Sequence, residues 1–160
     1  MKILVVSDTH KNYAVLKSAV ESNMDADVVI HLGDGEHEFL DVSRDYPQKA
    51  MVYVGGNCDF GQHELTHIVN ACGYKIFCCH GHEYHVHNGL ELLVSEARKN
   101  GCKIALFGHT HLYRTEIIDG VFVMNPGSLD SPRNHNKPTF GVIELDRSGD
   151  IKMNIFAVEN

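Results

Sequence analysis

The chain has 160 residues, of which 43% are hydrophobic and 22% charged, and its formal net charge is −7 with histidine neutral. This length fits one domain, residues 1–160, whose core needs no disulfide or structural metal to fold. The acidic balance argues against long nucleic acid and anionic membranes as partners, but it leaves open a small phosphate-bearing substrate held by a metal.

Targeting and redox signals are consistent with a cytoplasmic protein. The N-terminal apolar run is too short for a signal peptide, and no stretch approaches the roughly 18 apolar residues of a membrane span. The five cysteines include no CxxC pair, and an odd count of this kind predicts free thiols in a reducing compartment.

Short apolar runs without alternation recur along the first two-thirds of the chain. Such runs are typical of strands that are buried on both faces. They are ILVV (3–6), VVI (28–30), MVYV (51–54), IFCC (76–79) and IALF (104–107).

Helical spacing lies between several of these runs. It predicts helices over 12–22, with Asn12 as N-cap, over 36–46, ended by Pro47, and over 89–100, with Gly101 just past its end. These alternating strands and helices favour an α/β fold.

Two further parts of the chain have an antiparallel texture. Segment 64–73 is ambiguous, because its apolar residues have helical spacing while THIV followed by glycine and YKIFCC also fits a hairpin. After residue 112, one hairpin is predicted around Asp119-Gly120 and a second over 139–158. A single α/β domain with two sheets and flanking helices accounts for all of these patterns.

Polar side chains follow each of the five apolar runs at once. In open α/β sheets the site lies just beyond the carboxyl ends of the strands, so five strand ends would direct ligand atoms at one place. The residues are Asp8 and His10, then Asp34, then Asn57, Cys58 and Asp59, then His80 and His82, and finally His109 and His111.

Each of these motifs is weak alone, and their ordered set indicates a metal centre. Aspartate, asparagine and histidine together supply mixed oxygen and nitrogen ligands, which suit Mn, Fe, Zn, Co or Ni better than Ca or a thiolate zinc site. Seven donors are too many for one catalytic ion, and they suit two ions that share one carboxylate.

The order D-x-H, GD, GN, HG, GH-x-H resembles the calcineurin-like metallophosphoesterase superfamily. The details SDTH, GNCD, HGH and NPGS…PR look like its small bacterial and archaeal phosphodiesterase branch, over residues 7 to about 133. The resemblance implies a four-layer α/β/β/α sandwich of two facing mixed sheets between helices, and it makes 64–73 a hairpin.

The resemblance also implies a ligand set for two divalent ions, with manganese expected and Ni, Fe, Zn, Co and Mg as alternatives. One ion would be held by Asp8, His10, Asp34 and His111. The other would be held by Asn57, His80 and His109, with Asp34 bridging the two. A hydroxide between two such ions could attack the phosphorus of a diester.

Cys58 departs from the pattern, because many members of the superfamily have at this position a histidine that protonates the leaving oxygen. Cys58 could be a small side chain that only fills space beside the site, a proton donor, or a thiolate beside the cations. The absence of the histidine favours substrates with acidic leaving groups. His82, His85 and His87 are alternative donors. Arg133 is a candidate for binding the substrate phosphate, or a surface residue.

The sequence therefore predicts a metal-dependent phosphodiesterase acting on a small phosphodiester. A non-enzymatic interaction scaffold on the same fold and a phosphomonoesterase are the alternatives. The oligomeric state is left open, with a homo-oligomer as one outcome, and the substrate is not identified.

Overall fold

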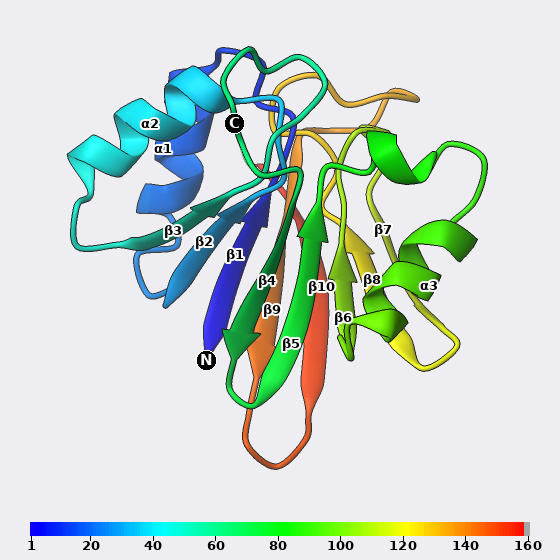
Figure 1. Ribbon diagram of the computed structural model, residues 1–160. Helices are drawn as coiled ribbons and strands as arrows, with labels where there is room; N and C mark the ends of the chain where they lie inside the picture. Colours follow the sequence, from blue (N-terminus) through cyan, green and yellow to red (C-terminus); the bar gives the residue numbers. More distant parts are fainter. Residues whose placement is uncertain (159–160) are drawn as a thin grey trace.

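Within residues 1–158, ten strands form two five-stranded sheets that share one apolar core. The structure is a computed structural model that describes residues 1–158. In Figure 1 strands β4 (Thr66–Ala71) and β5 (Tyr74–Cys79) of one sheet lie in front of β9 (Thr139–Leu145) and β10 (Ile151–Ala157) of the other, and helices lie on the outer flank of each sheet. The predicted α/β architecture of two mixed sheets between helices is confirmed.

The first sheet has the strand order β10–β9–β1–β2–β3. Its strands are β1 (Lys2–Val6), β2 (Val28–His31), β3 (Ala50–Tyr53), β9 (Thr139–Leu145) and β10 (Ile151–Ala157). The pairs β1–β2 and β2–β3 are parallel, whereas β9 and β10 form an antiparallel hairpin that continues the sheet beside β1. The hairpin predicted over 139–158 is therefore confirmed.

The second sheet has the order β4–β5–β6–β8–β7. Its strands are β4 (Thr66–Ala71), β5 (Tyr74–Cys79), β6 (Ile104–Leu106), β7 (Arg114–Ile118) and β8 (Val121–Asn125). Segment 64–73 belongs to the β4–β5 hairpin, whose turn uses Cys72 and Gly73 with φ of 53° and 87°. Asp119 and Gly120, with φ of 48° and 76°, turn β7 into β8 as the Asp-Gly signal predicts.

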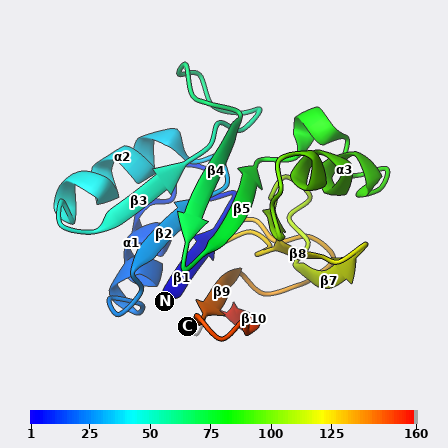
Figure 2. The ribbon, with the colours of Figure 1, turned by 60° about the horizontal axis from the view of Figure 1, so that its bottom comes forward.

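In the described part of the chain three α-helices are present, and Figure 2 shows them on the outer faces of the sheets. They are α1 (Tyr13–Glu21), α2 (Glu36–Asp45) and α3 (Glu91–Lys99), and a short 3₁₀ helix spans His82–Tyr84. The carboxamide of Asn12 accepts a hydrogen bond from the N–H of Val15 and begins α1, while Gly101, with φ of 69°, follows the end of α3. None of the helices in residues 1–158 is long and apolar enough to cross a bilayer.

Strands without polar alternation are explained by burial on both faces. In β1, Ile3 and Val5 pack between the two sheets, whereas Leu4 and Val6 pack under α1 and α2. The second sheet repeats this division, because Ile76 and Cys78 face the inter-sheet core and Phe77 and Cys79 face α3. Each strand thus joins two apolar layers, which positions its carboxyl end rigidly.

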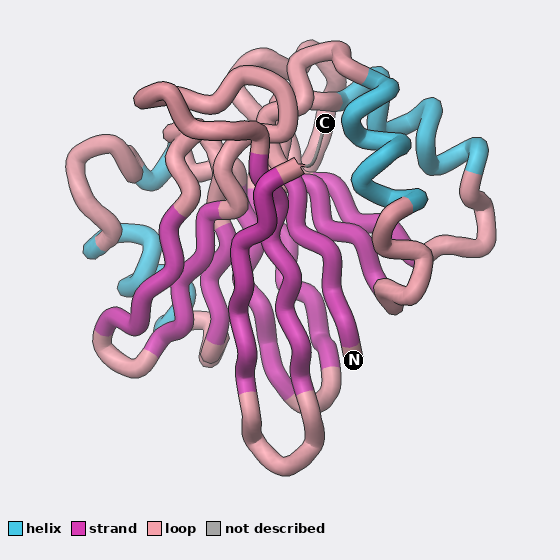
Figure 3. The backbone as a smooth tube through the Cα atoms, turned by 180° about the vertical axis from the view of Figure 1, so that it is seen from behind, coloured by secondary structure: helices cyan, strands magenta, loops and turns pink. Residues whose placement is uncertain are grey.

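The loops that leave β1, β2, β3, β5 and β6 gather at one end of the two sheets, at the top of Figure 3. Backbone hydrogen bonds join them. Each bond ends on a backbone carbonyl oxygen. The N–H of Asp8 donates to that of Gly33, the N–H of His10 to that of Asp34, and the N–H of Gly108 to that of His80. The fold therefore brings the predicted ligand loops of both sheets together.

We expect Ile104→Ala to lower the free energy of unfolding by about 2–5 kcal/mol, because it leaves a cavity in the inter-sheet core. Ile117→Ala, on β7 where the side chain is 61% exposed, is the matched control and should cost under about 0.5 kcal/mol. Urea unfolding of the metal-free protein measures both. Equal losses in the two variants would contradict a shared core between the sheets.

Candidate metal centre

Five of the seven predicted ligands have a left-handed backbone. Their φ angles are 56° for Asp8, 43° for His10, 57° for Asp34, 65° for His109 and 59° for His111. Non-glycine residues in this region each carry strain of about 1–3 kcal/mol, and they persist only where surrounding contacts hold them. Such clustering is typical of a functional site.

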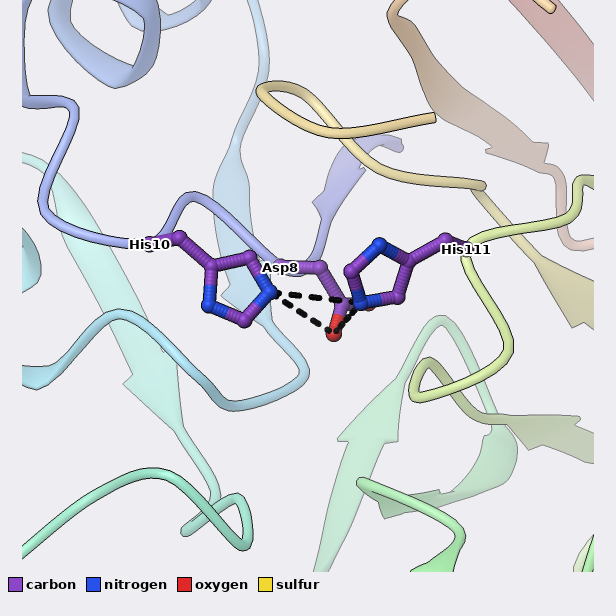
Figure 4. A group of neighbouring side chains, drawn as sticks. All are labelled: Asp8, His10 and His111. Carbon is purple, nitrogen blue, oxygen red and sulfur yellow. Dashed lines mark hydrogen bonds and ion pairs between the residues drawn. The ribbon is translucent and has the colours of Figure 1, made fainter. Parts of the chain in front are cut away.

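Asp8, His10 and His111 form the first half of the site. Figure 4 shows the two imidazoles approaching the Asp8 carboxylate from either side. The Nε2 atom of His111 lies 3.3 Å from Asp8 Oδ1 and 3.2 Å from His10 Nε2. Asp8 is fully buried, and its Oδ1 has no hydrogen-bond donor.

The contact of Nδ1 determines which nitrogen of the neutral His111 ring carries the proton. Its Nδ1 lies 2.6 Å from the carbonyl oxygen of Ser131, which can only accept, so the neutral ring carries its proton on Nδ1. The lone pair of Nε2 then points at a carboxylate oxygen. This arrangement of acceptors facing acceptors in a buried place fits a cation between them.

Asp34, Asn57, His80 and His109 form the second half of the site. His80 is fully buried, and its Nδ1 lies 2.6 Å from the carbonyl oxygen of Leu32, so the same argument leaves a lone pair on Nε2. That Nε2 lies 3.1 Å from Asn57 Oδ1 and 3.5 Å from Asp34 Oδ2, both acceptors. The His109 ring lies 5.0 Å from the His80 ring.

The two halves are continuous. Three groups of possible ligand atoms each lie within 4.8 Å of one another, and they share members: Asp8–His10–His111, Asp8–Asp34–His80 and His10–Asp34–Cys58. Asn57 and His109 adjoin the same cluster through His80. The seven residues thus come together at one centre, and their oxygen and nitrogen donors fit divalent transition ions.

The electrostatics of the histidines favour positive charge at this centre. Asp8, the main cause, raises the pKa of His111. Burial works to lower the pKa of His80, yet hydrogen bonding to Asp34 and the charges of Asp8 and Asp34 raise it overall. The pKa of His109 falls to about 4, mainly through burial and then through His80, which keeps its ring neutral as metal ligation requires.

Asp59 supports the Asp34 loop, and the sequence alone did not reveal this role. Its carboxylate accepts four backbone N–H groups, from Asp34, Gly35, Glu36 and Gly56, and the hydroxyl of Tyr53 at 2.6 Å. Burial opposes its ionisation, but the Tyr53 hydroxyl and these N–H groups lower its pKa. The only signal in the sequence was its place directly after Cys58.

Glu38 supports the Asp8–His10 loop and was also missed. It is 3% exposed, and its Oε1 accepts from the Thr9 hydroxyl at 2.6 Å and from the Lys11 N–H at 2.7 Å. The Thr9 hydroxyl also lies 2.9 Å from Nε2 of His31. His31 is fully buried, and this burial lowers its pKa to about 4. A charged residue four positions before Val42, on the buried side of the predicted helix, was the available signal.

The NPGS turn supports the remaining ligand loops. Asn125 donates to the carbonyl of Gly108 at 2.7 Å and to the Thr110 hydroxyl at 3.0 Å. Ser128 donates to the carbonyl of Asp8 at 2.7 Å. The turn therefore holds both the Asp8 loop and the His109–His111 loop in their strained conformations.

Gly108 acts by its size. A Cβ there would lie 2.0 Å from Ser7 Oγ and 3.0 Å from Asp8 Oδ2, so only glycine lets β6 end against the β1 loop. His109 and His111 themselves carry the left-handed turn. His111 then joins Asp8, whereas His109 lies beside His80.

Cys58 lies at the centre, and Arg133 lies at its edge. Cys58 is exposed, its Sγ belongs to the group with His10 and Asp34, and its N–H donates to Asp34 Oδ1 at 2.8 Å. Partial desolvation of the thiol, followed by its hydrogen bond to Asp34 and the charges of Asp34 and Asp59, raises its pKa to about 11. Arg133 is exposed, and its N–H donates to the carbonyl of His111.

The alternative proton donors lie along the loop after β5. The His87 ring is 4.7 Å from His109, and the His82 ring is 5.4 Å from His80. His85 is exposed and, with φ of 50°, ends the 3₁₀ helix. His82 and His87 thus border the second half of the site.

Comparison with known proteins adds to this geometry. The model of the "Calcineurin-like phosphoesterase superfamily domain" matches residues 1–148. A "Probable metallophosphoesterase" from Mycoplasma pneumoniae is 36% identical over 150 residues, covering 91% of each chain. A protein named phosphodiesterase from Methanocaldococcus jannaschii is 27% identical over 164 residues, covering 92% of this chain and 95% of that one.

The fold is shared with solved structures. A conserved uncharacterized protein from Streptococcus pneumoniae superposes with a TM-score of 0.81 over 98% of this chain and 97% of that one, at 22% identity. At this identity the likeness concerns the fold alone.

We expect Asp59→Asn to lower the free energy of unfolding of the metal-free protein by about 1.5–3 kcal/mol at pH 7, because charge-assisted hydrogen bonds are lost. The folded pKa of Asp59 lies below its unfolded value of about 3.9, so its contribution is full above that pH and is lost as the pH falls below it. The gap between wild type and variant should therefore close below about pH 4.

Urea unfolding from pH 3 to pH 7 in the presence of chelator measures this gap. Asp150→Asn, on the exposed turn between β9 and β10, is the charge-matched control. A gap that stays constant across this pH range would rule out the support that we assign to the Asp59 carboxylate.

Proposed function

The chain belongs to the calcineurin-like metallophosphoesterase superfamily, in its small phosphodiesterase branch, and from this premise we propose that it is a divalent-metal-dependent phosphodiesterase. One observation carries the proposal: acceptor atoms face one another at the centre, with the buried Asp8 Oδ1 opposite His111 Nε2 and Asn57 Oδ1 opposite the buried His80 Nε2. A cation bound between them would satisfy such contacts without protonating the ligands.

The donor set supports two ions. Asp8, His10 and His111 would hold one, and Asn57, His80 and His109 would hold the other, with Asp34 between them. When bound, two adjacent divalent ions would activate a water molecule and would stabilise the negative charge of the phosphate oxygens. Manganese fits the mixed oxygen and nitrogen donors, as do Fe, Zn, Co, Ni and Mg with different preference.

The protein's own residues set the geometry of that reaction. The carbonyl oxygens of Leu32 and Ser131 orient His80 and His111, so that the Nε2 lone pairs of both rings are aimed at the site before any ion arrives. Asn57 adds a ligand oxygen without adding negative charge, which matters beside an anionic diester. Arg133, exposed beside the His111 loop, supplies a positive charge that can attract the substrate phosphate.

Cys58 directs the substrate preference toward acidic leaving groups. Cys58 presents a thiol and not an imidazole to the leaving oxygen, and a general acid works best with a pKa near the working pH, as that of histidine is. Phosphodiesters whose leaving group needs no proton are therefore the expected substrates.

We expect the purified protein, after loading with Mn²⁺ and removal of free metal, to retain close to two ions per chain and to hydrolyse bis(p-nitrophenyl) phosphate. Asp34→Ala should lose both ions, since Asp34 lies between the two halves, whereas His111→Ala should lose about one. Elemental analysis and p-nitrophenolate release measure these outcomes.

His67→Ala is the matched control, because this exposed histidine pairs with Glu64 on the β4 side of the fold. It should retain both ions and full turnover. Two bound ions with no hydrolysis of diesters would indicate a binding module, and faster hydrolysis of p-nitrophenyl phosphate than of the diester would indicate a phosphomonoesterase.

We expect Cys58→His to raise the turnover of diesters with poor leaving groups by at least tenfold, a part of the roughly 10²–10⁴ that a well-placed general acid can contribute. Turnover of p-nitrophenyl esters should change much less, because their leaving group needs no proton. Cys58→Ser, which adds no imidazole, is the control. An equal change for both substrate classes would contradict the missing proton donor.

A further inference from the structure

We propose that Phe60 forms a subsite that stacks against a planar aromatic ester group of the substrate, so that aryl or nucleobase-bearing phosphodiesters are preferred over alkyl ones. This inference rests on the proposed phosphodiesterase function and deepens it. It assigns a specificity-determining role to a side chain next to the metal centre.

Phe60 is the most exposed large apolar side chain in residues 1–158, at 89%. The next values are 61% for Ile117 and 57% for Leu92. An exposed aromatic ring forgoes the favourable burial of its apolar surface, and that gain becomes available when a ligand covers it.

The loop that carries Phe60 is held in place. The N–H groups of Phe60 and Gly61 both donate to Glu36 Oε2 at 3.1 Å, and Glu36 Oε1 pairs with His63 Nε2 at 3.0 Å. The preceding residue, Asp59, is fixed by its five hydrogen bonds to the neighbouring loops. The exposed ring is therefore presented by an anchored loop, which lowers the entropy lost on binding.

A cleft connects Phe60 with the metal centre. It is lined by Phe60, His10, Asp34 and Cys58 among others, and its volume is about 90 Å³. His10, Asp34 and Cys58 are also one of the groups of possible ligand atoms. A phosphate held at the metals would thus place one ester group in the cleft against Phe60.

The size of the cleft limits that group. A cavity of about 150 Å³ encloses benzene, so an open cleft of about 90 Å³ can cover part of one planar ring beside Phe60 and cannot enclose a whole nucleotide. Stacking on an aromatic side chain accepts any planar ring, because every such ring has a π-face. The subsite should therefore select for planarity with little preference between bases.

Two phosphonates test this subsite by direct binding, because their P–C bond resists hydrolysis. Phenylphosphonate and methylphosphonate share the head group and differ in the ring. We expect the Mn²⁺-loaded wild type to bind phenylphosphonate about 5–10-fold more tightly in calorimetry, the low end of base–aromatic stacking.

Phe60→Ala should abolish this preference while leaving the affinity for methylphosphonate unchanged, and Phe60→Tyr should restore the preference. Phe156→Ala is the matched control, because Phe156 is an exposed ring on β10 that stacks on Phe140 outside the cleft. It should retain the wild-type preference.

A second readout uses the absence of tryptophan from the chain. In Phe60→Trp the single indole reports on the cleft, and 4-nitrophenylphosphonate should quench its fluorescence at concentrations where methylphosphonate does not. A phenyl preference that survives in Phe60→Ala, or an indole that 4-nitrophenylphosphonate leaves unquenched, overturns the subsite. Failure of both phosphonates to bind the Mn²⁺-loaded wild type also overturns the subsite, whereas the proposed function itself fails only if the same protein does not hydrolyse bis(p-nitrophenyl) phosphate.

Discussion

Buried acceptor atoms that face one another are the constraint on which the rest of this structure depends. The Asp8 carboxylate is fully buried, and it faces an imidazole nitrogen whose partner nitrogen already gives its proton to Ser131. While that imidazole is neutral, Asp8 Oδ1 has no donor within residues 1–158, so the site is suited to the positive charge of a bound cation. The raised pKa of His111 expresses the same demand as an affinity for protons.

Holding these atoms together strains the backbone, and the surroundings compensate for the strain. The ligand residues with left-handed φ lie on loops from both sheets, and three supports hold those loops. The Asp59 carboxylate accepts hydrogen bonds from backbone N–H groups around Asp34, and the Glu38 carboxylate accepts one from the N–H of Lys11. Side chains of the NPGS turn donate to the carbonyl oxygens of Asp8 and Gly108. Most of these contacts are charge-assisted or buried, which is where a hydrogen bond stabilises most.

The elements of this fold could be read closely from the sequence, because burial on both faces leaves a clear pattern. The predicted run ILVV corresponds to β1, and each of the other four runs matches a strand within two residues at either end. Segment 64–73 was different, since an edge strand with one exposed face carries apolar residues at spacings that also suit a helix. Pairing with β5 decides its conformation, and that pairing is a tertiary contact.

The sequence by itself determined which ligand atoms are present and that they follow strand ends, because residue type and position after an apolar run are local properties. Only the tertiary structure decided which atoms meet. It separates His109 from His111, brings Cys58 beside His10 and Asp34, leaves Arg133 at the edge and exposes Phe60 at the cleft. These outcomes depend on how two facing sheets are packed and on supports such as Asp59, whose partners lie up to 25 residues away in the chain.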